Sequence, residues 1–292
     1  MMVLDNRMRE ILHKVELSLF ESAQKSTIQL FHNDKPEWEK SMPEPVGSGV
    51  FIELDDCYYI VTAAHVVQGY ALKKLRNPYR SDDDYDDSSE AHLTLNNIGI
   101  FYNQSYYPIQ RVVFTNVENG IIENNVDLAV LFLDLESAEE LKQSFIFVSI
   151  NRMILNHHIN TESRYFIYGY PADWTEIVDS TEKIISKPFK YITKGFLVQE
   201  LTNIRHYDAK YNILLLYDKR IMVHTESGQP LEDFCPKGIS GCGLWYYAGG
   251  QSLSLIGIMI EDKWTQQQQP LMMATRIDEV IAIIRKAKSQ DG

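Results

Sequence analysis

The sequence predicts a mostly β protein with a helix at each end. Short runs rich in β-branched and aromatic residues recur through its middle, and such runs favour strands. Both ends instead carry apolar residues at helical spacing. With 292 residues, of which 45% are hydrophobic, the chain is long enough for two ordinary-sized domains with cores of their own.

The first expected element is a helix over residues 5–25. Asp5 can cap its start. One face is apolar and consists of Met8, Ile11, Leu12, Val15, Leu19 and Phe20. Two interpretations stay open for this helix: it packs on the outside of the β structure that follows, or it is a docking helix for a partner protein.

Strands dominate from residue 49 onward. Residues 49–54 and 58–62 flank Asp55 and Asp56, which predicts a hairpin. The other runs of strand composition are residues 111–114, 128–133, 165–169, 193–200, 213–216 and 253–260.

The last expected element is a helix over residues 276–287. Its apolar residues recur at helical spacing and are Ile277, Val280, Ile281 and Ile284.

The composition limits what the protein binds and where it acts. The formal net charge of −12 argues against a nucleic acid or an anionic membrane as the general partner. No apolar run is long enough to span a bilayer, and residues 1–25 lack the apolar core and cleavage site of a signal peptide. The three cysteines, Cys57, Cys235 and Cys242, form no disulfide framework, so we expect a reducing, cytoplasmic environment.

Three short segments in a fixed order carry the clearest chemistry. VTAAHVV places His65 after an apolar run, VDLAVL places Asp127 before one, and KGISGCGLW places Ser240 between glycines. Each segment alone has an ordinary interpretation, as a surface or core histidine, a strand start or a tight turn. All three in the order His, Asp, Ser indicate a hydrolytic triad.

These segments resemble those of the trypsin-like (chymotrypsin-fold) serine proteases, in their divergent intracellular bacterial form, over roughly residues 44–285. The resemblance implies two six-stranded antiparallel β-barrels with N-terminal and C-terminal helices. Residues 1–43 would form a helical extension. Residues 44–150 would form the first barrel, with His65 and Asp127, and residues 151–292 the second, with Ser240 and the last helix.

The resemblance also gives each side chain a role. Ser240 is the nucleophile, which needs a neighbouring base because a hydroxyl is weakly nucleophilic at neutral pH. His65 is that base and later the acid for the leaving amine, and Asp127 orients its imidazole. The backbone N–H groups of Gly238 and Ser240 form the oxyanion hole. Cys242 is interpreted as a packing residue, and this chemistry needs no cofactor.

Other expectations concern activation and specificity. Ile239 stands directly before the nucleophile, where activated digestive members carry an acid that pairs with a freed N-terminal amine, so we expect no activation by N-terminal cleavage. Phe234 is expected at the base of the specificity pocket, where an apolar side chain suits a small or apolar substrate residue. An edge strand around Ile256 and Gly257 is expected to pair with the substrate backbone.

The strongest anomaly of composition is the Asp-rich run at residues 81–87. One interpretation is a solvated loop. The other is a calcium site, because hard cations bind clustered carboxylates. His157 and His158 have no cysteine or histidine partners at zinc spacing, so no metal is predicted there.

The predicted function is therefore a serine endopeptidase that cleaves a protein or peptide substrate through an acyl-enzyme intermediate. Gating by a partner protein or by ordering of the oxyanion loop stays open. The alternative is a catalytically silent binding module on the same fold. An esterase of the α/β-hydrolase type is disfavoured, because that fold has G-x-S-x-G and the order Ser, acid, His.

Overall fold

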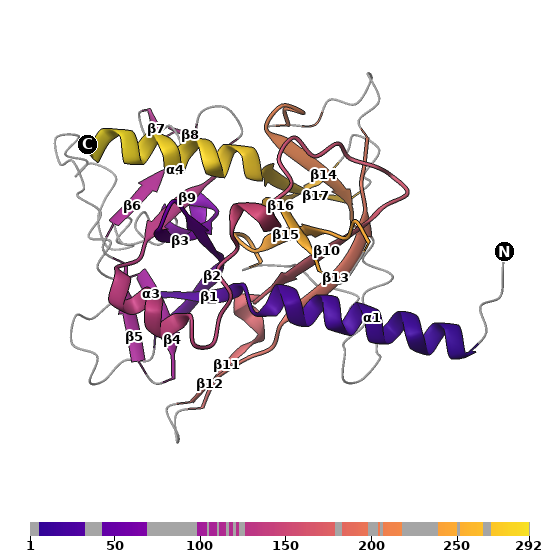
Figure 1. The fold of residues 1–292 in the computed structure, drawn as a ribbon, viewed down its shortest axis with the longest axis horizontal. Coiled ribbons are helices and arrows are strands. Elements are labelled where there is room, and N and C mark those ends of the chain that lie inside the picture. Colours follow the sequence, from indigo (N-terminus) through magenta and orange to yellow (C-terminus); the bar gives the residue numbers. More distant parts are fainter. Residues whose placement is uncertain are drawn as a thin grey trace, which may run out of the picture.

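The computed structural model describes residues 6–32, 43–68, 98–103, 105–109, 111–114, 117–118, 121–122, 126–178, 183–197, 204, 207–217, 239–249, 252–264 and 270–291. Two strongly curled antiparallel sheets, of seven and six strands, lie side by side, and each end of the chain is helical (Figure 1). The predicted fold class is thus confirmed, with seven strands instead of six in the first sheet. The arrangement is consistent with a double-barrel fold such as the chymotrypsin-like one.

The first sheet has the strand order β5-β4-β1-β2-β3-β9-β6. Its strands are β1 (Thr27–His32), β2 (Glu44–Leu54), β3 (Cys57–Thr62), β4 (Ile98–Tyr102), β5 (Ser105–Pro108), β6 (Arg111–Phe114) and β9 (Ala129–Phe132). A separate ribbon pairs β7 (Val117–Glu118) with β8 (Ile121–Ile122). The extension expected over residues 1–43 is not wholly helical, because β1 is an inner strand whose residues are all buried between β2 and β4.

The hairpin predicted around Asp55 and Asp56 is confirmed. β2 and β3 pair up to Leu54 and Cys57, which leaves a turn of two residues. Both turn residues have positive φ, 50° at Asp55 and 58° at Asp56. This conformation is that of a type I′ turn, whose twist matches the twist of the flanking strands.

The second sheet has the order β13-β10-β15-β16-β17-β14. Its strands are β10 (Arg164–Gly169), β13 (Phe189–Lys194), β14 (Asn212–Leu216), β15 (Gly243–Tyr246), β16 (Ser254–Trp264) and β17 (Pro270–Arg276). Its two edges meet where Gly195 pairs with Leu215, so the sheet curls back on itself. The ribbon of β11 (Thr175–Val178) and β12 (Lys183–Ser186) extends from it (Figure 1). The strand expected at residues 193–200 is instead β13, which starts earlier and ends at Lys194.

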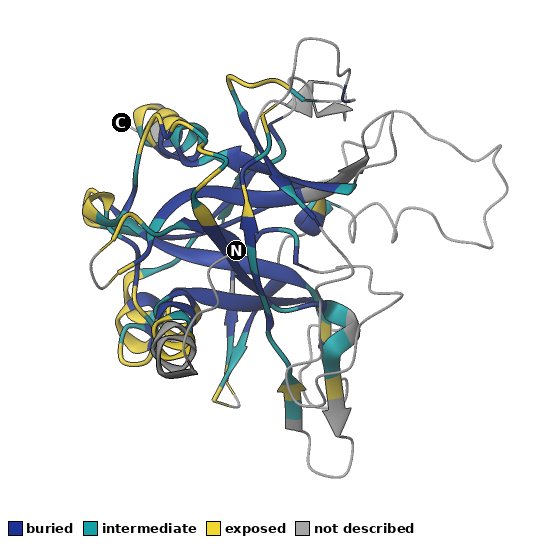
Figure 2. Cartoon of the chain, turned by 90° about the vertical axis from the view of Figure 1, so that its right-hand side faces the viewer, coloured by how far each residue is buried: buried dark blue, intermediate teal, exposed yellow. Residues whose placement is uncertain are grey.

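The central strands are buried on both faces, as the dark strands of Figure 2 show. In β2, Phe51 belongs to the core of the first sheet, to which a few side chains of β14, β16 and β17 also contribute. Its neighbours Val50 and Ile52 belong to the core between the two sheets. In β10, Ile167 faces the core inside the second sheet and Phe166 the core between the sheets. Burial on both faces explains why these strands read as continuous apolar runs without alternation.

Helices α1 (Asn6–Gln24) and α4 (Ile277–Asp291) cover the core between the sheets. The short helix α3 (Leu135–Leu141) instead packs on the core of the first sheet. Two 3₁₀ turns are η3 (Ile150–Arg152) and η4 (Ala172–Trp174). The predicted C-terminal helix is confirmed, but α4 contacts strands of both sheets, namely β6, β9, β16 and β17. Among the described residues no helix is long and apolar enough to cross a membrane.

Helix α1 packs on the sheets through its second half, as the first of its two interpretations expects. Leu19 and Phe20 are buried, and the ring of Phe20 lies edge-on to that of Phe166 at 5.5 Å between centroids. Val15, expected on the same apolar face, is 40% exposed. The first turns of α1 extend beyond the strands in Figure 1.

A buried histidine ties the segment after η3 to the second sheet. The ring of His157 packs on Tyr165 and Tyr246, and its Nε2 lies 3.2 Å from the Tyr165 hydroxyl. Arg276 donates a hydrogen bond of 2.6 Å to the backbone carbonyl of His157. Burial lowers the pKa of His157, and the positive charges of Arg276 and His158 lower it further. The unfolded chain therefore takes up this proton at a higher pH than the folded one.

We expect the free energy of unfolding to fall as the pH drops below about 6.5, the ordinary histidine pKa, because protonation of His157 then favours the unfolded chain. His157→Gln should flatten this dependence. Urea denaturation between pH 7.5 and pH 5 measures it. His13→Gln is the control, since His13 is an exposed histidine on α1. Equal pH slopes in His157→Gln and the wild type would contradict the assignment.

Candidate active site

The strand pairing explains how two residues 62 positions apart meet. Thr62, the last residue of β3, pairs with Ala129, the first residue of β9. Because the pair is antiparallel, the chain after Thr62 and the chain before Ala129 leave the sheet at the same end. His65 lies in the helical residues 64–68 that follow Thr62, and Asp127 lies two residues before Ala129.

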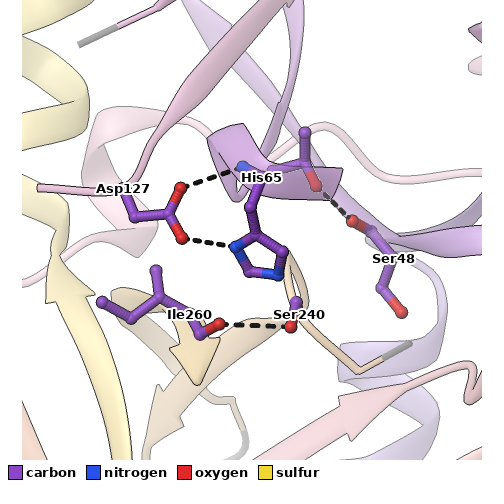
Figure 3. Close-up of polar contacts among 6 residues, drawn as sticks. Ser48, His65, Asp127, Ser240 and Ile260 are labelled. Carbon is purple, nitrogen blue, oxygen red and sulfur yellow. Dashed lines mark hydrogen bonds and ion pairs between the residues drawn. The ribbon is translucent and has the colours of Figure 1, made fainter. Parts of the chain in front are cut away.

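The carboxylate of Asp127 contacts His65 with both oxygens (Figure 3). Oδ1 accepts a hydrogen bond of 3.0 Å from the backbone N–H of His65, and Oδ2 is hydrogen-bonded to the imidazole Nδ1. An ionised carboxylate only accepts, so Nδ1 carries the hydrogen and Nε2 carries the lone pair of the neutral imidazole. The imidazole, whose side chain is 45% exposed, is thus held in the form that a general base requires.

A tight turn carries Ser240 in front of β15. The N–H of Cys242 donates to the carbonyl of Ile239 at 3.0 Å, and Gly241 has a φ of 87°. This hydrogen bond and the positive φ at the third position are those of a type II turn. A Cβ at Gly241 would lie 2.1 Å from the Ser48 carbonyl oxygen, so the close approach of two backbones also requires glycine.

The segment of His65 and the turn of Ser240 pack on the same stretch of β2. The N–H of Ser48 donates to the Ser240 carbonyl at 3.0 Å. One residue earlier, a Cβ at Gly47 would lie 2.8 Å from the Val66 side chain and 3.2 Å from the Ser240 carbonyl oxygen. The structure therefore brings together the three predicted triad residues, and Figure 3 shows the imidazole of His65 between Asp127 and Ser240.

The hydroxyl of Ser240 points to β16 in this structure. It donates a hydrogen bond of 3.2 Å to the carbonyl of Ile260 (Figure 3). Ile260 lies at a β-bulge, where the register between β16 and β17 shifts between Met259 and Glu261. Among the contacts drawn between the described residues of the site, none joins the Ser240 hydroxyl to His65. Its N–H also has no hydrogen-bond partner among the described residues.

The expected edge strand at Ile256 and Gly257 is not what the structure shows. β16 lies between β15 and β17, and Gly257 pairs with Leu244 on one side and Arg276 on the other. Ile256 is fully buried. A substrate strand could pair at Gly257 only by displacing a strand of the sheet.

Gly238 and Phe234, expected in the oxyanion hole and the specificity pocket, lie outside the described residues, as does the Asp-rich run 81–87. Within the described part of the chain, no three His, Cys, Asp or Glu side chains are grouped as metal ligands. Cys242 is fully buried beside the turn, as expected of a packing residue.

Two residues of the site were missed in the sequence, Ser48 and Ile260. The contact of Ile260 with Ser240 depends on a β-bulge, and no pattern of residues predicts that bulge. Ser48 has a signal, because it stands between Gly47 and Gly49, and glycines inside a strand often mark a place where another backbone comes close.

No protein-family model matches the chain, and no curated protein matches it significantly. What the fold and site define is a class: a β protein of two curled antiparallel sheets, with a histidine, an acid and a serine gathered where the sheets meet.

We expect Gly241→Ala to lower the free energy of unfolding by about 3 kcal/mol, from the strain of positive φ and from overlap with Ser48 and Thr62. Urea denaturation measures it. Gly249→Ala is a matched control, since Gly249 has a φ of 97° but no atom within 4 Å of the added Cβ. The control should lose only about 1 kcal/mol, the cost of the backbone conformation. Equal losses in the two variants would show that the close approach to Ser48 does not matter.

Proposed function

We propose that the chain is a trypsin-like serine endopeptidase that cleaves protein or peptide substrates. The observation that carries this proposal is the two-point contact between Asp127 and His65, with the imidazole facing Ser240. A histidine used only for packing or solvation has no need of a carboxylate that fixes both its backbone and its tautomer.

The chemistry follows from these contacts. Nε2 of His65 takes the proton of the Ser240 hydroxyl as the oxygen attacks the substrate carbonyl. Asp127 stabilises the imidazolium that results. The N–H of Ser240, free among the described residues, is one donor for the oxyanion, and Gly238 is the proposed second donor. The imidazolium then protonates the leaving amine, and a water attacks the acyl-enzyme by the same route in reverse.

The hydrogen bond from Ser240 to Ile260 has to break before this reaction. A typical hydrogen bond contributes about 0.5–1.5 kcal/mol net, which lowers the population of the reactive conformation by roughly tenfold at most. Rotation of one serine side chain therefore modulates the reaction without abolishing it. The small free-energy cost of this rotation favours an active enzyme over an inactive one.

A second candidate is a silent binding module on the same fold. The observation that favours it is the direction of the Ser240 hydroxyl, away from His65. This second candidate would be favoured if the Ser240 hydroxyl turned toward His65 only when a partner protein is bound. The place proposed for such a partner is α1, where Val15 and Leu17 are 40% and 42% exposed.

The free thiols of Cys57 and Cys242 fit the proposed cytoplasmic location.

We expect a fluorophosphonate probe to label the wild-type protein at Ser240, because the probe reacts only with an activated serine. Ser240→Ala should abolish labelling, and His65→Ala should slow it by several orders of magnitude. Mass spectrometry of the labelled peptide identifies the site. Ser289→Ala, which removes a serine of α4, is the control and should label like the wild type. A folded wild type without label, or label that survives Ser240→Ala, would refute the proposal.

Asp127→Asn should keep the fold but slow labelling and ester hydrolysis by about 10⁴-fold, because an amide favours the wrong imidazole tautomer. Asp134→Asn is the matched control. Asp134 caps α3 by accepting from the N–H of Ser137 at 2.7 Å, and an asparagine side chain caps a helix about as well, so this variant should keep both its stability and the wild-type rate. A rate in Asp127→Asn within tenfold of the wild type would remove Asp127 from the mechanism.

A further inference from the structure

A single buried serine makes hydrogen bonds to three parts of the site. Ser48, on β2, is fully buried. Its N–H donates to the Ser240 carbonyl at 3.0 Å, and its own carbonyl accepts from the Thr62 hydroxyl at 2.7 Å. Its side-chain Oγ accepts from the N–H of Tyr170 at 2.9 Å. All three of these groups on Ser48 thus have partners.

These partners belong to the parts whose relative position sets the geometry of the triad. Thr62 ends β3, three residues before His65. Tyr170 directly follows β10 of the second sheet. Ser240 lies in the turn before β15, which pairs with β10. Ser48 therefore connects the strand that carries the base with the sheet that carries the nucleophile.

The side chain of Ser48 adds what the backbone alone cannot. Any residue would offer the N–H and the carbonyl, but only a hydroxyl of this size reaches the N–H of Tyr170. The surroundings are tight, since a Cβ at Gly169 would lie 3.1 Å from the Ser48 Oγ and 2.8 Å from the Cβ of Cys242. The Ser48 hydroxyl thus lies against the end of β10. At this place β10 also contacts Cys242, two residues after Ser240.

We propose that Ser48 is a positioning residue, whose hydroxyl fixes the Ser240 turn relative to His65 by holding the end of β10 to β2. The inference rests on the proposed protease function. His65 and Ser240 belong to different sheets, so a small slip between the sheets changes the distance from base to nucleophile. Misplacement of a reacting group by about 1 Å can cost about 100-fold in rate.

The test compares fluorophosphonate labelling of Ser48→Ala with that of Tyr165→Phe. Both changes remove a hydroxyl that accepts one backbone N–H: that of Tyr170 for Ser48, and that of Asn160, at 2.9 Å, for Tyr165. Both sites are fully buried, but Tyr165 lies at the other end of β10. The readouts are kinact, KI, the pH profile of labelling and the urea midpoint.

We expect kinact of Ser48→Ala to fall at least tenfold, with KI and the pH profile unchanged because the His65–Asp127 pair is intact. Tyr165→Phe should lose comparable stability and keep its kinact. Ser48→Thr, which restores a hydroxyl, should recover most of the rate.

A second pair of variants decides the matter if Ser48→Ala does not fold. Thr62→Val removes the hydrogen bond to the Ser48 carbonyl, and Thr62→Ser keeps it. The proposal expects slow labelling in the first variant and near-normal labelling in the second.

If the wild type is labelled at Ser240, two results overturn the positioning role and leave the proposed function standing. One is a wild-type kinact in Ser48→Ala or, failing that variant, in Thr62→Val. The other is an equal fall of kinact in Ser48→Ala and Tyr165→Phe. An unlabelled, folded wild type instead overturns the proposed function, and the positioning role with it.

Discussion

The close approach of two backbones, at Ser48 in β2 and at Gly241 in the turn that carries Ser240, is the constraint on which the site depends. The turn is fixed by hydrogen bonds on both sides, from Ser48 to Ser240 and from Gly241 to the Met259 carbonyl at 2.7 Å. Contact this close leaves no room for a side chain at Gly241. Ser240 therefore lies at the junction of the two sheets, where these hydrogen bonds fix the backbone of its turn.

The rest of the fold holds the two sheets against each other at that junction. Strands from both sheets contribute to a shared apolar core, for example Ile52 from the first sheet and Phe166 and Trp245 from the second. Helix α4 spans the two sheets over this core, and Lys288 at its end donates to the Asp55 carbonyl at 2.8 Å. Burial of apolar surface, which has no direction, holds the sheets together, and the few directional bonds at Ser48 set their register at the site.

The polar groups of the site come from two different parts of the fold. Asp127 and His65 come from a single sheet, so their contact is as rigid as the β3–β9 pair that carries them. Ser240 comes from the other sheet, and its hydroxyl donates to the Ile260 carbonyl. The contact between Asp127 and His65 is thus formed within one sheet, whereas the direction of the Ser240 hydroxyl is set by the other.

Much of this could be predicted from the sequence, because some features depend on local patterns. The Asp55–Asp56 turn, the terminal helices, the strands β6 and β10 and the order of His65, Asp127 and Ser240 each follow from residue types at short spacing. The inner strand β1, the burial of β16 between two neighbours and the bulge at Ile260 did not, because pairing partners and register depend on contacts far apart in the chain. The sequence by itself determined which groups can do chemistry. Only the tertiary structure decided that Asp127 contacts His65 with both oxygens, that Ser240 points to Ile260 and that Ser48 links the two sheets. The first two geometries come from the pairing of strands that are distant in the sequence, and the third comes from the packing of one sheet against the other.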